Sequence, residues 1–152
     1  KGSQLKRIIY ESNFFNIMTK IYCFGNKDLE EDNIALKLAD EFNNDTELTL
    51  KGFEFEKATN PDFFLNENFE NKEIVIIDAV KGIDNIKIIN NLDDLKETKT
   101  TTMHDFDLGN TLKLLKKLDK VKEVTIIGIP YGKELKKFDK ESIKMILQSL
   151  GN

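Results

Sequence analysis

The most constraining feature of this sequence is the run EIVIIDAV, from Glu73 to Val80. It consists mainly of β-branched and aliphatic residues and carries one carboxylate near its end, Asp78. A strand this apolar indicates the interior of a parallel sheet that is covered by helices on both faces, and the ligands of such sheets gather at the carboxyl ends of the strands. We therefore expect Asp78 to lie at the strand end, on the ligand-binding edge of the sheet.

Predicted strands alternate with predicted helices along the chain. The strands are expected at Thr19–Phe24, at Leu48–Phe55 with a bulge at Gly52 and a lateral position, at Glu73–Val80, at Ile86–Ile89 and at Val124–Ile129. Helices are predicted by apolar stripes at positions 35, 38, 39 and 42, at 108, 112, 115 and 118, and at 143, 146, 147 and 150, the last with Asp139 as its cap. Pro61 opens a short helical turn, and the polar segment 90–102 reads as a mobile loop. This alternation predicts an α/β/α three-layer sandwich with a mostly parallel central sheet of about five strands.

Length and composition set the remaining limits. The chain has 152 residues, 39% of them hydrophobic, which predicts one domain at 18–152. Residues 1–17 precede a Met18 that looks like a natural start, and we set them apart as an N-terminal extension or an expression-derived segment. The net charge of -4 offers no basic surface, so nucleic acid and anionic membranes are not expected partners. A single cysteine and the lack of an apolar run of ~20 residues predict a soluble, cytoplasmic protein.

Three side chains are candidates for one site at the carboxyl edge of the sheet. Asp32 lies in an acidic cluster after the first strand, which taken alone is typical of a solvated loop with a helix cap. Asp78 is harder to explain structurally, because a carboxylate after buried apolar residues carries a desolvation cost. His104, the only histidine, precedes a predicted helix. Two carboxylates and one imidazole together suit a borderline divalent ion such as nickel or zinc. Cys23, within the first strand, reads as a small buried hydrophobe.

Four segments, in order, resemble the hydrogenase maturation endopeptidases. They are Gly25-Asn26 followed by Glu31-Asp32, the strand IVIIDAV, the segment TTMHDFDLGNTL with His104, Asp107, Leu108 and Gly109, and the segment VTIIGIPYGKEL. The resemblance covers nearly everything after Met18. It implies an endopeptidase that recognises nickel in the precursor of a nickel-iron hydrogenase large subunit and removes the C-terminal peptide of that precursor.

The resemblance also implies roles for individual residues. Asp32, Asp78 and His104 fall on the nickel ligands, and the nickel is supplied with the substrate, although zinc or cadmium is also expected to fit the site in a crystal. Asp32, Asp78 and Glu56 are the candidate catalytic residues, in an aspartyl-protease-like role. Gly25, Asn26, Lys57 and Thr59 are the candidate substrate-binding residues. Either the metal or a carboxylate can activate water in such a site, and the sequence leaves both routes open.

The chain departs from the family pattern at two places. Asn33 stands where the family usually has glycine, and asparagine can adopt the left-handed backbone conformation. After the second predicted strand the family carries an Asp-Gly-Gly-Thr type of loop, where this chain reads Glu56-Lys57-Ala58-Thr59. Losing the glycines removes backbone freedom, so we expect a changed precursor specificity.

Two other functions stay open on the sequence alone. A signalling receiver domain phosphorylated on Asp78 would use Glu31-Asp32 and Lys133 with magnesium, but it leaves His104 without a task. A non-catalytic module that binds nickel or the precursor is compatible with the altered loop.

Overall fold

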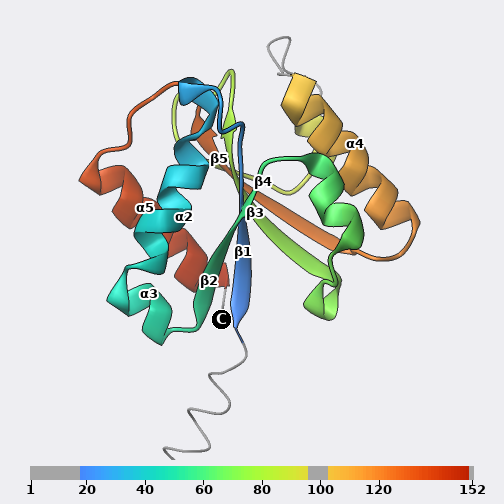
Figure 1. The fold of residues 1–152 in the computed structure, drawn as a ribbon, viewed down its shortest axis with the longest axis horizontal. Helices are drawn as coiled ribbons and strands as arrows, with labels where there is room; N and C mark the ends of the chain where they lie inside the picture. Colours follow the sequence, from blue (N-terminus) through green and yellow to red (C-terminus); the bar gives the residue numbers. More distant parts are fainter. Residues whose placement is uncertain (1–17, 96–102, 151–152) are drawn as a thin grey trace, which may run out of the picture.

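The computed structural model describes residues 18–95 and 103–150, with side chains for 18–95 and 107–150. The strands of this part of the chain are β1 (Thr19–Phe24), β2 (Phe53–Ala58), β3 (Glu73–Val80), β4 (Lys87–Ile89) and β5 (Glu123–Pro130). They form one sheet in the order β2-β1-β3-β5-β4 (Figure 1). All neighbouring pairs are parallel except β4, which runs antiparallel to β5.

Helices cover both faces of the sheet. On one face lie α2 (Ile34–Asn43), α3 (Thr46–Leu50) and α5 (Lys137–Leu150), and on the other lies α4 (Met103–Lys117), with the 3-10 helices η2 (Pro61–Asn66) and η4 (Leu92–Leu95) packed against it (Figure 1). Two further 3-10 helices are η1 (Glu30–Asp32) and η3 (Glu70–Lys72). Each face has its own cluster of buried apolar side chains. The predicted three-layer α/β sandwich with a mostly parallel sheet is confirmed.

The central strands and α2 follow the sequence pattern closely. In β3 and β5 the last five residues are all buried, because helices cover both faces of these strands. The stripe predicted for α2, Ala35, Leu38, Ala39 and Phe42, is buried in full. The helical turn at Pro61 is also observed, and so is the short strand predicted at Ile86–Ile89, which forms β4 over Lys87–Ile89.

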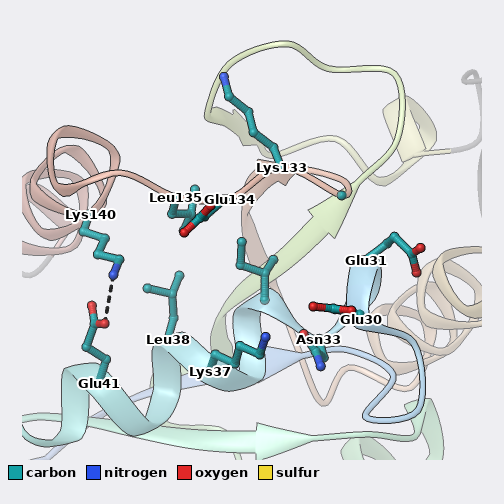
Figure 2. Close-up of a pocket in the computed structure, with 12 residues that line it drawn as sticks. Glu30, Glu31, Asn33, Lys37, Leu38, Glu41, Lys133, Glu134, Leu135 and Lys140 are labelled. Carbon is teal, nitrogen blue, oxygen red and sulfur yellow. Dashed lines mark hydrogen bonds and ion pairs between the residues drawn. The ribbon is translucent and has the colours of Figure 1, made fainter.

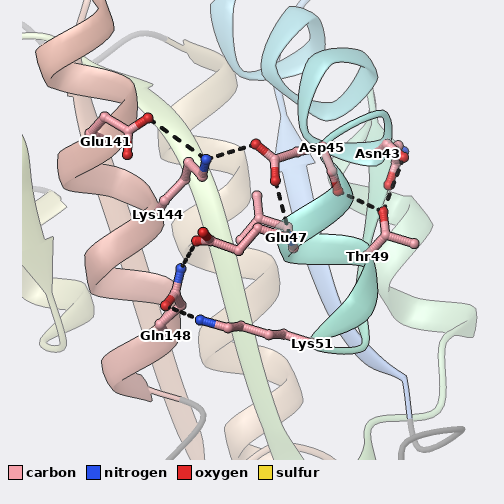
Figure 3. Close-up of polar contacts among 9 residues, drawn as sticks. Asn43, Asp45, Glu47, Thr49, Lys51, Glu141, Lys144 and Gln148 are labelled. Atoms are coloured by element: carbon pink, nitrogen blue, oxygen red, sulfur yellow. Dashed lines mark hydrogen bonds and ion pairs between the residues drawn. The ribbon is translucent and has the colours of Figure 1, made fainter.

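The predicted strand Leu48–Phe55 is wrong in its first half. Residues Thr46–Leu50 form α3, which begins because the Asp45 side chain accepts a hydrogen bond from the Leu48 backbone N–H at 3.0 Å (Figure 3). Gly52 has a φ of 83°, so it ends this helical segment instead of forming a bulge. The strand starts only at Phe53, and its expected lateral position is confirmed.

Three smaller predictions also need correction. Leu118 does not belong to the buried stripe of α4, since it lies beyond the helix and is 57% exposed. Asp139 lies inside the first turn of α5, where its carboxylate accepts a hydrogen bond from the Lys136 N–H at 2.9 Å. Within the segment predicted as a mobile loop, Leu92 and Leu95 are buried in η4, while residues 96–102 and the N-terminal segment 1–17 lie outside the described part of the chain.

The outer edge of β2 is partly covered by a side chain. The Asn43 amide donates from Nδ2 to the Phe55 carbonyl at 2.8 Å, and its Oδ1 accepts from the Phe55 N–H at 2.9 Å. This pair of bonds occupies the backbone groups that an added strand would need. None of the helices in residues 18–95 and 103–150 has the length and apolar character needed to cross a membrane.

Candidate functional site at the carboxyl edge of the sheet

Asp78 lies where the carboxyl ends of the central strands meet. Its Cα is in register with Phe24, the last residue of β1, and with Gly128 of β5. The strand continues for two residues beyond it, to Val80, so Asp78 does not end β3 as expected. Its side chain is fully buried, with an exposed fraction of 0%. Since Ile76 and Val80 pack on the α4 side of the sheet, the alternation of a strand puts Asp78 on that face too.

Asp32 is brought back to the end of β1 by a closed loop. The Asn26 N–H donates to the Asp32 carbonyl at 3.1 Å, and the Asp32 N–H donates to the Leu29 carbonyl at 3.0 Å. Asp32 is 1% exposed, whereas the neighbouring Glu30 and Glu31 are exposed. The solvated-loop interpretation therefore fails for Asp32 itself. Nor does it cap α2, because the capping position belongs to Asn33.

A second connection supports η1 from the other side, and sequence reasoning missed it. The Gly132 N–H donates to the Glu31 carbonyl at 3.1 Å, while the Tyr131 N–H donates to the Val80 carbonyl at 3.1 Å. The segment after β5 is thus joined to both η1 and the end of β3. Gly132 has a φ of 71°, a conformation that favours glycine. The glycine after Pro130-Tyr131 was the one feature of the sequence that could have indicated a turn at this point.

His104 is the second residue of α4, and its side chain lies outside those described. Helix α4 begins near the end of the sheet where β1 and β3 finish (Figure 1). It packs through Leu108, Leu112 and Leu115 on the face to which Asp78 belongs. The backbone therefore starts the histidine-bearing helix on the same face as Asp78, and at the end of the sheet where both aspartates lie.

The EKAT segment does not form the loop expected after the second strand. Glu56, Lys57 and Ala58 belong to β2, and only Thr59 follows it. Glu56 forms an ion pair with Lys20 at 3.0 Å. It lies two strands away from Asp78 and is displaced by two residues along the strand direction, so the two Cα atoms are roughly 12 Å apart. Lys57 forms an ion pair with Asp40 of α2, at 2.7 Å, on the opposite face of the sheet.

The structure therefore divides the predicted site residues into two groups. Asp32, Asp78, Gly25, Asn26 and Thr59 lie at the carboxyl edge, whereas Glu56 and Lys57 lie within β2. Asp32 and Asp78 are the buried charged residues of the described chain. No set of three His, Cys, Asp or Glu residues that could hold a metal occurs among the side chains described, which do not include His104.

Cys23 has no role in this chemistry. Its thiol is fully buried, and that burial raises its pKa to about 12. A thiol with this pKa is protonated at neutral pH and is a poor nucleophile. The interpretation of Cys23 as a small buried hydrophobe is confirmed.

Comparison with protein families gives a match to the family described as hydrogenase maturation protease over residues 54–147, more than half of the chain. This chain belongs to the hydrogenase maturation protease family. It is accordingly a peptidase. The receiver-domain alternative is not supported, since the family is a different one and since β4 is antiparallel to its neighbour, unlike the strands of a doubly wound parallel sheet.

Solved structures of other proteases of this kind share the fold. The hydrogenase maturating endopeptidase HybD from E. coli is 14% identical, with a TM-score of 0.58 and coverage of 88% of this chain and 90% of that one. The solution structure of the endopeptidase HycI from Escherichia coli is 21% identical, with a TM-score of 0.58 and coverage of 86% and 88%. The NiFe hydrogenase maturation protease HycI from Thermococcus kodakarensis KOD1 is 17% identical, with a TM-score of 0.51 and coverage of 89% and 94%. Comparison with curated proteins gave no match.

Proposed function

We propose that this hydrogenase maturation protease recognises nickel in the precursor of a nickel-iron hydrogenase large subunit and removes the precursor's C-terminal peptide. The nickel arrives as part of the substrate and is contacted by Asp32, Asp78 and His104. The observation that carries the proposal is the burial of two carboxylates, with exposed fractions of 1% and 0%, at the carboxyl edge of one sheet. The cytoplasm is the proposed location of the reaction.

The chemistry of the two aspartates supports this assignment. Burying a carboxylate is costly, and a cation that binds beside it offsets the cost. The nickel ion of the precursor is such a cation, and its remaining ligands come from the precursor. Carboxylate and imidazole donors suit borderline divalent ions, so zinc or cadmium is expected to compete for the same residues.

The reaction itself is the hydrolysis of one peptide bond. A water molecule attacks the scissile carbonyl carbon, the C–N bond breaks, and a proton passes to the leaving amine. A carboxylate of the protease can take the proton from the attacking water and then deliver it to that amine. Asp32 and Asp78 are our candidates for this proton transfer, while Glu56 is a weaker candidate because it pairs with Lys20 away from the edge.

The test is incubation of the purified protease with a large-subunit precursor in nickel-loaded and metal-free forms, followed by intact-mass spectrometry. We expect loss of a C-terminal peptide from the nickel-loaded form alone. Asp78→Asn, Asp32→Asn and His104→Ala should each lower the cleavage rate by roughly 100-fold or more, the scale of losing a group that acts in catalysis.

Two outcomes point to other functions. Nickel-dependent binding without cleavage would indicate a non-catalytic precursor-binding module. Cleavage that is equally fast with the metal-free precursor would remove nickel from the recognition step. Measuring binding and cleavage on the same samples separates these outcomes.

A further inference from the structure

A groove lies between α2 and the segment that connects β5 to α5. It has a volume of about 540 Å³, within the roughly 300–1,000 Å³ typical of ligand pockets, which is room for a few residues of peptide. We call it the α2–α5 groove. Its apolar part is formed by Ile34, Leu38 and Leu135. Figure 2 shows Leu38 and Leu135 on the two sides of the groove. The ion pair between Glu41 and Lys140, at 2.9 Å, marks one end.

The other end of the groove adjoins the candidate site. There it is lined by Glu31 and Asn33, the residues on either side of Asp32, and by Gly132. The hydrogen bond from the Gly132 N–H to the Glu31 carbonyl joins the two walls at this end. A peptide held near Asp32 therefore needs only a few extended residues to reach the groove.

Asn33 offers this peptide a side-chain amide that makes no hydrogen bond within the described part of the chain. Its Oδ1 is buried and accepts no hydrogen bond from any residue in the described part of the chain, and its side chain does not cap α2. A buried carbonyl oxygen without a donor is unfavourable, so turning the amide toward a peptide backbone gains hydrogen bonds. The backbone φ of Asn33 is -102°, so Asn33 does not use the left-handed conformation that asparagine can adopt.

The same chain already contains an example of this recognition. The Asn43 amide pairs with both the N–H and the carbonyl of Phe55, two contacts at 2.9 and 2.8 Å. Asn33 stands at the opposite end of the same helix from Asn43.

The charged side chains around the groove are also available to contact a bound peptide. Glu30, Glu134, Lys37 and Lys133 line it and make no ion pair with a described residue. Acidic and basic groups both surround an apolar floor, which suits an aliphatic side chain flanked by polar residues. On the basis of the proposed function, we propose that the α2–α5 groove binds an extended segment of the precursor next to the cleaved bond, with the Asn33 amide pairing with its backbone.

The proposal is tested with Asn33→Gly, which removes the amide alone. Glycine is a tolerated residue at a helix N-cap, so the variant should fold. Its matched control is Asn44→Gly, the same substitution at the exposed C-cap of α2, away from the groove. Steady-state cleavage of the nickel-loaded precursor gives kcat and KM for each protein, and thermal unfolding verifies folding.

We expect Asn33→Gly to raise KM by about fivefold, the scale of losing a hydrogen bond, with kcat unchanged, and Asn44→Gly to match the wild type. A wild-type KM in Asn33→Gly would overturn the groove assignment while leaving the proposed function intact. A fall in kcat alone would also overturn it, because Asn33 would then act by positioning Asp32. Absence of cleavage by the wild-type protein would overturn the proposed function, and the groove assignment with it.

Discussion

Gly25 lies directly against the backbone of Asp32: a Cβ atom added to Gly25 would stand 2.3 Å from the Asp32 carbonyl oxygen. Real Cβ atoms do not approach a backbone oxygen this closely, so a side chain here has to displace the loop. The same carbonyl accepts the hydrogen bond of the Asn26 N–H. The Gly25-Asn26 turn therefore holds Asp32 at the end of β1 by close approach as well as by hydrogen bonding.

Gly25→Ala should consequently damage both the fold and the site. We expect a loss of about 1–3 kcal/mol in the free energy of unfolding, since the methyl group meets backbone and not a movable side chain. A carboxylate displaced by about 1 Å commonly costs ~100-fold in rate, and we expect a loss of this size in cleavage. Denaturant unfolding and precursor cleavage measure the two effects.

Gly109→Ala is the matched control for this prediction. Gly109 lies within α4, and among the described residues an added Cβ would meet Leu95 Cδ1 alone, at 3.9 Å, an ordinary van der Waals distance. Alanine in a helix interior should raise stability by roughly 0.5–1 kcal/mol. Equal stabilities for the wild type and Gly25→Ala would show that the loop adjusts freely and that the close contact is unimportant.

The parts of the fold that the sequence predicts are those in which side-chain burial dominates. The runs at Glu73–Val80 and Val124–Ile129 have to be covered on both faces, and the stripe of α2 fits one helical face only. The error at Leu48–Phe55 has the opposite origin. The alternation of Leu48 and Leu50 suggested a strand. The local structure is instead determined by the Asp45 cap and the left-handed conformation of Gly52. Leu50 is accordingly 75% exposed and does not belong to a buried strand face.

The candidate site shows the same division. Asp78 could be found from the sequence because a carboxylate inside an apolar strand is unusual. Asp32 could be found only as one acid in a cluster, since its burial depends on the loop that closes on Gly25 and Asn26. The contact between Gly132 and Glu31 joins backbone atoms, and a pattern of side chains carries almost no information about it. Glu56 was misplaced for a related reason, because the strand was predicted to begin and end too early.

Asn43 should be important for stability although it lies at a helix end. Replacing it with alanine removes both hydrogen bonds to Phe55 and leaves the backbone of an edge strand uncovered. We expect Asn43→Ala to lower the free energy of unfolding by about 1–3 kcal/mol and to increase aggregation on heating. Asn44→Ala, at an exposed neighbour, should stay within about 0.5 kcal/mol of the wild type. Chemical unfolding and light scattering provide the comparison, and equal values for the two variants would contradict the edge-covering role.

Cys23 should be unreactive in the folded protein. With a pKa of about 12, roughly one thiol in 10,000 is ionised at pH 8, and the sulfur is also inaccessible. A thiol reagent such as Ellman's should therefore react with the native protein only as fast as it unfolds, and at once in guanidinium chloride. Rapid labelling of the native protein would contradict the burial of this strand.

Asp45 combines two interactions that substitutions can separate. Its carboxylate caps α3 through the Leu48 N–H, and it forms an ion pair with Lys144 of α5 at 2.7 Å (Figure 3). Asp45→Asn keeps a good capping group and removes the charge, whereas Asp45→Ala removes both. We expect the alanine variant to lose about 1 kcal/mol more stability than the asparagine variant, which is the typical value of an N-cap.

The charge of Asp45 should also give stability that depends on pH. Its hydrogen bond with Lys144, followed by that with the Leu48 N–H, lowers its pKa below the ordinary 3.8. The folded state thus favours the ionised form, and the wild type should exceed Asp45→Asn in stability by a constant amount above pH 3.8. As the pH falls below that value the unfolded state binds the proton first, so the difference should shrink and then vanish. Asp40→Asn is the control, because Asp40 pairs with Lys57 with 65% of its side chain exposed and water screens such a pair. A difference between wild type and Asp45→Asn that persists to pH 2 would show that the ion pair does not stabilise the contact between α3 and α5.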